Sequence, residues 1–168
     1  MKQVLAPALI AAALGLGGCV GFQPLYARSE VIKTLGSIQI LAPAGRTGYL
    51  MRQHLDDAFA KDRSAPPRYA MDLTLAEARF PRGVRIDNVA TRYEYVLTAN
   101  YALKTLPAGA LAKRGQVRVE LTYDSADQPY ASISAQQDAQ DRAADEAARR
   151  IELELAVWLA NGAKVAAR

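Results

Sequence analysis

The sequence has very little of the side chains that most often bind metals or act as nucleophiles. Its 168 residues include one cysteine and one histidine. A single cysteine leaves no partner for an internal disulfide, and no Cys/His cluster has the spacing of a zinc site. A glycine-rich phosphate loop is also missing, because Gly15, Gly17 and Gly18 belong to the apolar opening segment. We therefore expect no metal site and no cofactor other than a covalent lipid.

Catalytic groups are equally scarce. His54 lies between core positions of a predicted helix, and no Ser or Cys nucleophile has a partner suggested by the sequence, although a triad needs its base oriented by a third group. Acidic residues near the C-terminus alternate with arginine at pairing distance, which indicates a solvated helix face rather than a carboxylate dyad. The sequence therefore predicts a protein that is not an enzyme and has no catalytic residues.

A hydrophobic run long enough to span a membrane is missing too. Val4–Gly18 is almost entirely apolar, but its length of about 15 residues is short of the roughly 20 that a spanning helix needs. Lys2 before this run and small residues after it are typical of a secretory signal peptide. We predict that residues 1–18 are a signal peptide.

The only cysteine, Cys19, stands where this apolar run ends. Leu16-Gly17-Gly18-Cys19 resembles the lipobox of bacterial lipoproteins, in which the sulfur receives a diacylglyceryl group and the new N-terminus is acylated, for example with palmitate. Several acyl chains give stable anchoring, and Val20, in place of aspartate, favours the outer membrane and its periplasmic side. Two alternatives remain: a buried thiol that packs like a small hydrophobe, and a plain signal peptide cleaved elsewhere.

The rest of the chain has the size and composition of one globular domain. About 150 residues remain, and the whole sequence is 51% hydrophobic and 23% charged. We expect a lipidated cysteine and linker at 19–34, one α+β domain at 35–162 and a C-terminal tail at 163–168.

Apolar periodicity predicts the element order β-α-β-β-β-α. The early elements are a strand at 35–41, a helix at 47–61, and strands beginning near Tyr69, Val89 and Val117. A phase shift near Ala76 and Ala78 indicates a bulge, and Pro81–Val84 reads as a turn. Tyr130–Ser134 is expected to extend the sheet briefly.

The last predicted element is a helix over residues 135–161. Ser134 and Gln137 have capping-box spacing, and Gly162 reads as a stop. Three i,i+4 pairs with the acid first support the helix, namely Asp138–Arg142, Asp145–Arg149 and Glu146–Arg150.

Each predicted strand has one apolar face. We therefore expect a four-stranded, mainly antiparallel sheet with two helices packed on one face and the other face left comparatively open. Tyr93, Tyr95 and Tyr101 share the inward side of their strand and should be core residues. If that parity is reversed, they face a partner instead.

Charge is unevenly distributed along the chain. Arg79–Arg118 contains eight basic and two acidic residues, whereas the sequence from Val119 onward contains nine acidic and five basic residues. This asymmetry indicates an anionic partner, such as sugar or lipid phosphates, for the middle segment. The alternatives are ordinary solvated turn residues or contacts to acidic groups of a protein partner. The candidate residues are Arg79, Arg82, Arg85, Lys113 and Arg114.

Three stretches together resemble one known family. They are the lipobox running into Gly21–Tyr26 (GFQPLY), the strand Arg92–Leu103 (RYEYVLTANYAL), and Tyr130–Ile151 with its DAxxRAA core. In this order they are similar to LptE, the lipopolysaccharide-assembly outer-membrane lipoproteins, in their alphaproteobacterial form. The likeness covers nearly the whole mature chain, although no single stretch is specific.

This resemblance implies a function that residue spacing does not show. LptE proteins plug the lumen of the β-barrel translocon LptD, support the assembly of that barrel and bind lipopolysaccharide, and they have no known catalytic residues. The resemblance therefore implies a lipid-anchored outer-membrane subunit whose partners are an LptD-type barrel and lipopolysaccharide. The alternative function is a periplasm-facing lipoprotein that serves as a binding module in phospholipid transport. Nucleic-acid binding is disfavoured because the signal peptide exports the chain.

Overall fold

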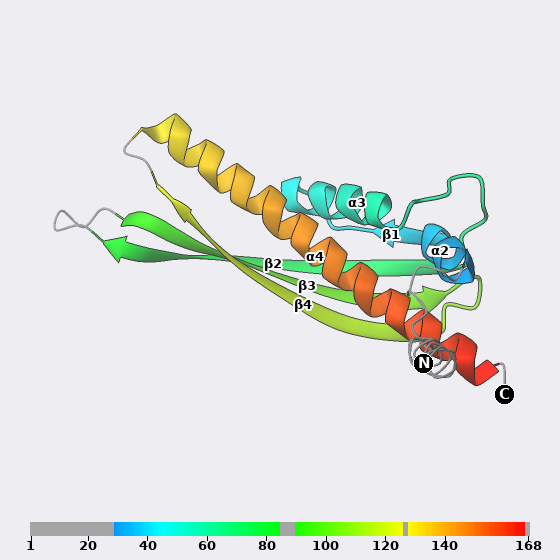
Figure 1. Ribbon diagram of the computed structural model, residues 1–168. Helices are drawn as coiled ribbons and strands as arrows, with labels where there is room; N and C mark the ends of the chain where they lie inside the picture. Colours follow the sequence, from blue (N-terminus) through cyan, green and yellow to red (C-terminus); the bar gives the residue numbers. More distant parts are fainter. Residues whose placement is uncertain (1–28, 85–89, 126–127, 167–168) are drawn as a thin grey trace, which may run out of the picture.

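The computed structural model describes residues 29–84, 90–125 and 128–166. Its elements are α2 (Ser29–Gly36), β1 (Ile38–Leu41), α3 (Arg46–Ala58), β2 (Tyr69–Val84), β3 (Ala90–Thr105), β4 (Leu111–Asp124) and α4 (Pro129–Ala166). Figure 1 shows two layers, a curved sheet and helices that lie across one of its faces. The predicted α+β class is confirmed. The predicted signal peptide, Cys19 and most of the linker lie outside the described residues.

The four strands lie in the order β1-β2-β3-β4. β1 runs parallel to β2 and pairs only with its first four residues, from Ile38 opposite Tyr69 to Leu41 opposite Asp72. The other two neighbouring pairs are antiparallel, so the sheet is mixed but mainly antiparallel, as predicted. Because β1 is so short, β2 has a free edge along most of its length.

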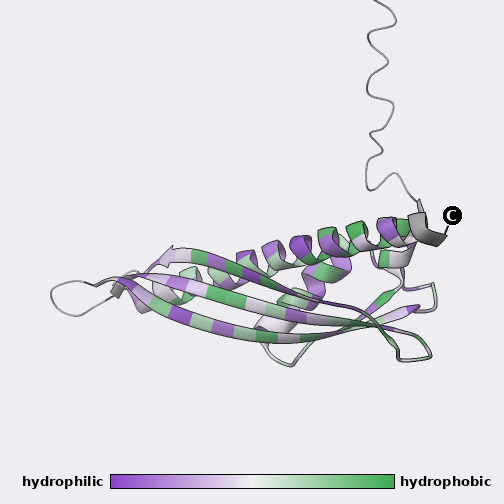
Figure 2. Cartoon of the chain, turned by 90° about the horizontal axis from the view of Figure 1, so that it is seen from below, coloured by the Kyte–Doolittle hydropathy of each residue, from purple (hydrophilic) through white to green (hydrophobic). Residues whose placement is uncertain are grey.

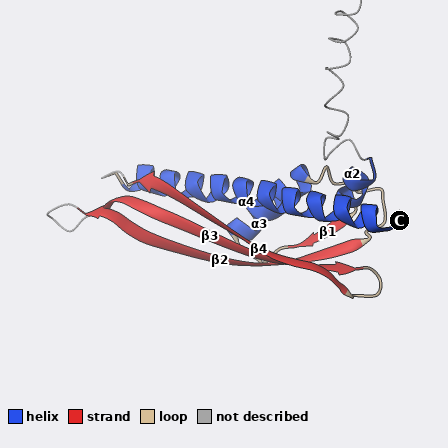
Figure 3. Ribbon diagram, turned by 60° about the horizontal axis from the view of Figure 1, so that its bottom comes forward, coloured by secondary structure: helices blue, strands red, loops and turns tan. Residues whose placement is uncertain are grey.

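The core lies between the sheet and the helices (Figure 3). Strand residues of one parity are buried there, including Met71, Leu97 and Val119, which are each at most 2% exposed. On α4, Ile151 and Leu155 are fully buried, together with a series of alanines whose small side chains let the helix approach the sheet closely. Figure 2 shows the alternation of hydrophilic and hydrophobic residues along the strands that produces this one-sided core.

Residues 29–36 form a helix where the sequence predicted a linker. Val31 and Leu35 are four residues apart and both buried, which is the spacing of one helix face. α2 contacts α4, so this short helix is held by packing rather than by its own propensity. As a result, the first strand begins at Ile38 and not at Leu35.

Two predictions about β2 are wrong. The register with β3 runs without a shift past Ala76 and Ala78, so there is no bulge, and Pro81–Val84 is strand rather than turn. Proline cannot donate to a neighbouring strand, but on the free edge of β2 no such donor is required. The irregularity that does occur lies between Leu103 and Lys104, in the pairing of β3 with β4.

The last helix is longer than predicted at both ends. Pro129 takes the first helical position, where its missing N–H has no helical partner in any case. Tyr130–Ser134 is therefore helix and not strand, and Ser134 with Gln137 forms no cap. The helix also continues through Gly162 to Ala166.

The three predicted i,i+4 ion pairs on α4 are confirmed. The distance from Arg142 Nε to Asp138 Oδ2 is 2.9 Å, and that from Arg150 Nε to Glu146 Oε1 is 2.8 Å. Arg149 and Asp145 form the third pair. All three are exposed, so each contributes roughly 0.3–0.5 kcal/mol at most to the helix.

Candidate functional site

The basic residues that the sequence singles out do not form one patch. Arg79 lies opposite Tyr95 of β3, whereas Lys113 lies opposite Leu103, eight residues further along the same strand. At the rise of a β-strand this separation is about 26 Å. Arg82 lies near Arg79 and Arg114 follows Lys113, so the candidates divide between the two ends of the sheet. Arg85 lies outside the described residues.

Arg79 is engaged within the fold on the helix-covered face. Its Nη1 donates to Gln136 Oε1 of α4 at 2.6 Å, and its guanidinium lies 4.9 Å from the centroid of the Tyr93 ring. That ring stacks on Tyr123 with centroids 5.7 Å apart. The cation therefore links β2, β3 and α4, which is a structural role.

On the opposite, open face of the sheet, most cations are paired. Arg82 Nε lies 2.5 Å from Glu94 Oε2, across the β2–β3 hairpin. The other pairs on this face are Arg92–Asp124 at 2.8 Å, Lys104–Asp72 at 2.7 Å and Arg118–Glu120 at 2.7 Å. Each exposed pair contributes little to stability. Together they make this face charged but nearly neutral.

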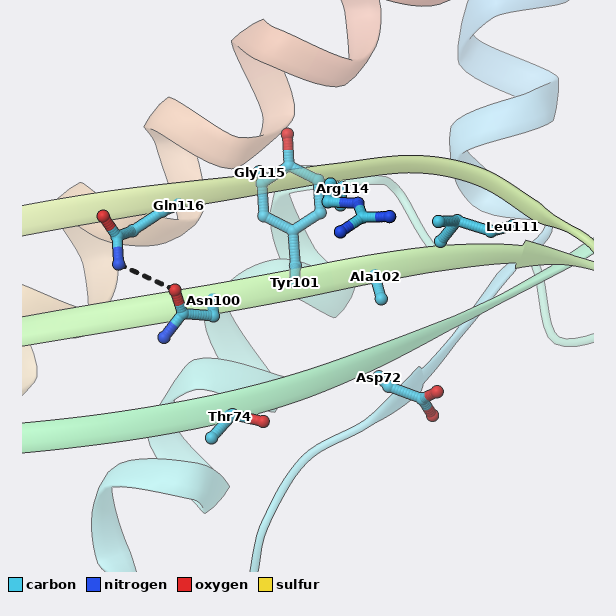
Figure 4. A pocket seen from close by; sticks show the side chains of 9 residues that line it. All are labelled: Asp72, Thr74, Asn100, Tyr101, Ala102, Leu111, Arg114, Gly115 and Gln116. Atoms are coloured by element: carbon cyan, nitrogen blue, oxygen red, sulfur yellow. Dashed lines mark hydrogen bonds between the residues drawn. The ribbon is translucent and has the colours of Figure 1, made fainter.

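Arg114 differs from these cations. It lines a shallow hollow of about 710 Å³ on the open face, at the end of the sheet where β4 begins (Figure 4). Its guanidinium forms no ion pair with any residue in the described parts of the chain. Gln116 Nε2 donates to Asn100 Oδ1 at 2.8 Å, and Thr74 and Leu111 also line the hollow. Asp72 lines it as well, and its carboxylate is paired with Lys104 at 2.7 Å. The site thus combines one unpaired cation, one carboxylate that already has a partner, several neutral polar groups and an apolar edge.

Beneath the hollow, β4 contains a glycine that its neighbour requires. Gly115 pairs with Tyr101, and the Tyr101 ring lies across the glycine backbone (Figure 4). A Cβ on Gly115 would lie 2.5 Å from Tyr101 Cζ, which is closer than real atoms approach. Tyr101 Oη donates to Glu154 Oε2 of α4 at 2.6 Å. Burial and this carboxylate raise the pKa of Tyr101 above its ordinary value.

A second tyrosine repeats the arrangement further along β3. Tyr95 Oη donates to Glu77 Oε2 at 2.6 Å, and Gln140 Nε2 of α4 donates to the same oxygen at 3.2 Å. Burial, followed by the bond to Glu77, raises the pKa of Tyr95. Tyr95 and Tyr101 are buried and Tyr93 is half-buried, so the predicted inward side of β3 is confirmed.

His54 of α3 has a structural contact that the sequence did not reveal. Its Nε2 lies 2.9 Å from Asp141 Oδ1, and its Nδ1 lies 3.9 Å from Asp145 Oδ1, both on α4. The contact therefore joins the two main helices. Within the described residues no group of three His, Cys, Asp or Glu side chains is placed to hold a metal ion.

Sequence reasoning missed the polar half of the hollow. Thr74, Asn100 and Gln116 are the outward residues of three alternating strands, and each alone reads as ordinary solvated sheet surface. Only the register between strands places them side by side. No helix in the described residues is long and apolar enough to cross a membrane.

Comparison with known proteins gives a consistent picture. The family described as LptE, lipopolysaccharide-assembly, matches residues 35–155. A putative lipoprotein from Caulobacter crescentus CB15 has a crystal structure that is similar with a TM-score of 0.70 and 50% sequence identity, covering 80% of this chain and 98% of that chain. No curated protein sequence matches the chain.

Two more distant structures share the fold. Rare lipoprotein B from Shewanella oneidensis is 15% identical with a TM-score of 0.57, covering 74% of this chain and 96% of that one. Lipoprotein B from Nitrosomonas europaea is 13% identical with a TM-score of 0.56, covering 76% and 86%.

Proposed function

Because the chain belongs to the LptE family of lipopolysaccharide-assembly proteins, we propose that it is the lipid-anchored, non-enzymatic plug subunit of an outer-membrane lipopolysaccharide translocon. In this function it supports the assembly of an LptD-type barrel, occupies the lumen of that barrel and binds lipopolysaccharide in transit. Cys19 carries the S-diacylglycerol and N-acyl chains that hold it on the periplasmic side of the outer membrane. The observation that carries the proposal is the family match over residues 35–155.

The open sheet face supports the plug role. Its charges are arranged in ion pairs, such as Arg82–Glu94 and Lys104–Asp72, so the face is polar without a strong field of one sign. The interior of an outer-membrane barrel is likewise polar, and wet protein interfaces tolerate such paired charges. A face of this kind suits a lumen wall better than it suits a hydrophobic partner.

The hollow around Arg114 supports lipopolysaccharide contact. A guanidinium binds phosphate or carboxylate groups in bidentate geometry, and Asn100, Thr74 and Gln116 offer amide and hydroxyl groups of the kind that bind sugars. Of the five basic candidates, Arg79 and Arg82 already have partners in the fold. We therefore assign the lipopolysaccharide contact to Arg114; Lys113 follows the inward parity of Leu103, so it lies on the other face of β4 and does not line the hollow.

The first test is an affinity pull-down of full-length tagged protein from detergent-solubilised outer membranes, followed by mass spectrometry. We expect one large barrel protein in a one-to-one ratio. Recovery of inner-membrane phospholipid-transport subunits without a barrel would refute the plug role. The same sample reports on the anchor, because Cys19→Ala should lose all covalent lipid and a fatty acid retained on that variant would contradict the assignment.

The second test concerns the Arg114 hollow. Arg114→Gln should weaken the binding of purified lipopolysaccharide by roughly 10- to 100-fold, because a charge-assisted hydrogen bond contributes roughly 1.5–3 kcal/mol. Arg118→Gln is the matched control, since that arginine lies on the same face but is paired with Glu120. Equal affinities for the two variants would exclude Arg114 as the contact.

A further inference from the structure

Exposed apolar residues gather at the end of the fold that holds the turn between β3 and β4. The β3–β4 turn reads Leu-Pro-Ala-Gly-Ala over residues 106–110, and all five residues are exposed. Leu106 is 37% exposed, and Leu111, directly after the turn, is 49% exposed. Ile32, on α2 at the same end, is 42% exposed (Figure 1). Exposed apolar residues that gather in this way mark a contact surface.

Free cations and interfacial aromatic residues lie beside this turn. The Leu106 N–H donates to the Arg68 carbonyl at 2.9 Å, so Arg68 is its direct neighbour. Neither Arg68 nor Lys113 forms an ion pair with another described residue. A hollow of about 440 Å³ next to Arg68 is lined by Val31, Tyr69 and Trp158, among others.

The combination has the chemistry of a membrane interface. Tyr69 and Trp158 meet edge to face with ring centroids 6.3 Å apart. Tryptophan and tyrosine concentrate at the headgroup level of bilayers, and arginine and lysine bury their stems there while the charge meets phosphate. The described residues at the opposite end also expose apolar and aromatic side chains, namely Phe80, Tyr130 and Ile133. There, however, Arg82 and Arg92 are already paired with carboxylates.

Chain length keeps this end close to the anchor. α2 begins at Ser29, ten residues after Cys19. Ten residues reach at most about 35 Å when fully extended. A lipid on Cys19 therefore holds α2 and the adjoining turn near the leaflet at high effective concentration, so that a weak surface contact is sufficient.

We propose that the β3–β4 turn end of the fold docks on the phospholipid leaflet that holds the anchor. Residues 106–111 enter the interfacial layer, Arg68 and Lys113 meet lipid phosphates, and the hollow beside Trp158 receives a headgroup. The docking orients the sheet relative to the membrane. It rests on the proposed function only through the lipid on Cys19.

The test uses the full-length lipidated protein in vesicles of phosphatidylcholine with a minor share of phosphatidylglycerol, without barrel protein or lipopolysaccharide. Because acylation consumes the Cys19 thiol, Ala108→Cys introduces the only free thiol, which is labelled with an environment-sensitive nitrobenzoxadiazole dye. Ala131→Cys is the matched control, since Ala131 is also exposed but lies at the opposite end, at the start of α4.

We expect the dye at 108 to shift to the blue on reconstitution and to be quenched by spin-labelled lipid, while the dye at 131 stays in water. Adding Leu106→Asp should lower the ratio of docked to undocked protein at least about tenfold, because a charge then replaces a leucine that would enter the interfacial layer of the bilayer. Ile133→Asp, at the control end, should change nothing.

The outcomes separate the two proposals. A lipidated chain whose dye at 108 behaves like the dye at 131 overturns the docking and leaves the plug function intact. A chain that mass spectrometry shows to lack lipid on Cys19 overturns the anchor itself, and with it the basis for docking.

Discussion

Replacing Gly115 with alanine tests the packing between β4 and α4 directly. The new Cβ would lie 2.5 Å from Tyr101 Cζ and 2.6 Å from Cε1, and the β4 backbone is held by its pairing with β3. The ring therefore has to move, and it then loses the bond from Tyr101 Oη to Glu154. Overpacking of this kind costs about 1–3 kcal/mol, and loss of a hydrogen bond to a carboxylate costs roughly 1.5–3 kcal/mol.

A small gain opposes these costs. Alanine in a strand is favoured over glycine by roughly 0.5–1 kcal/mol. The expected net loss in the free energy of unfolding is therefore about 2–4 kcal/mol, which lowers the melting temperature by roughly 5–15 °C for a domain of this size. This loss in the free energy of unfolding is measured by denaturant titration of the full-length protein in detergent, with far-ultraviolet circular dichroism as the readout.

Two controls isolate the cause. Gly162→Ala adds a Cβ on α4 that meets no atom within 4 Å, so this variant should be unchanged or slightly more stable. In a Tyr101→Leu background the clash partner is gone, and Gly115→Ala should then cost much less than in the native chain. An equal cost in the two backgrounds would refute the argument that the Tyr101 ring requires the glycine.

Three further predictions concern stability. The pKa values of Tyr95 and Tyr101 are raised, so the folded chain keeps protons that the unfolded chain releases above about pH 10. The resulting stabilisation is complete below that pH and is lost as the pH rises further. The double variant Tyr95→Phe/Tyr101→Phe should therefore show a weaker alkaline decline in its melting temperature. His54→Ala should lose the contact to Asp141 and lower the free energy of unfolding, measured by urea titration, by about 1 kcal/mol. An unchanged free energy of unfolding would mean that the contact is incidental. Leu155→Asp should leave the chain unfolded, because Leu155 is fully buried against the sheet, and a native melting curve for it would mean that the assigned face of α4 is wrong.

The predicted fold class was confirmed because local patterns carry it. Alternation of apolar residues specifies which face of β3 and β4 is buried, and the three acid-first pairs specify a helix over Asp138–Arg150. The predictions that proved wrong depend on what lies beside an element. Pro81 is compatible with strand only because β1 ends early, and α2 is helical only because α4 covers Val31 and Leu35.

The candidate site shows the same division. Charge alone identified five basic residues but gave them equal weight, because a sequence does not say which cations have partners. In the folded chain Arg79 is bound to Gln136 and Arg82 to Glu94, whereas Arg114 is left at a hollow. The partners come from other strands or from α4, between 12 and 57 residues away along the chain.

The sequence by itself therefore determined the fold class, the apolar faces of the main strands and of the last helix, the prediction of an anchor at Cys19 and the family. These properties depend on the spacing of residue types that are close together in the sequence. Only the tertiary structure decided which cations are neutralised, that Gly115 lies under Tyr101, and that an apolar turn shares one end of the fold with Arg68 and Trp158. Those properties depend on strand register and helix placement, which bring distant residues into contact and so decide what remains free to bind.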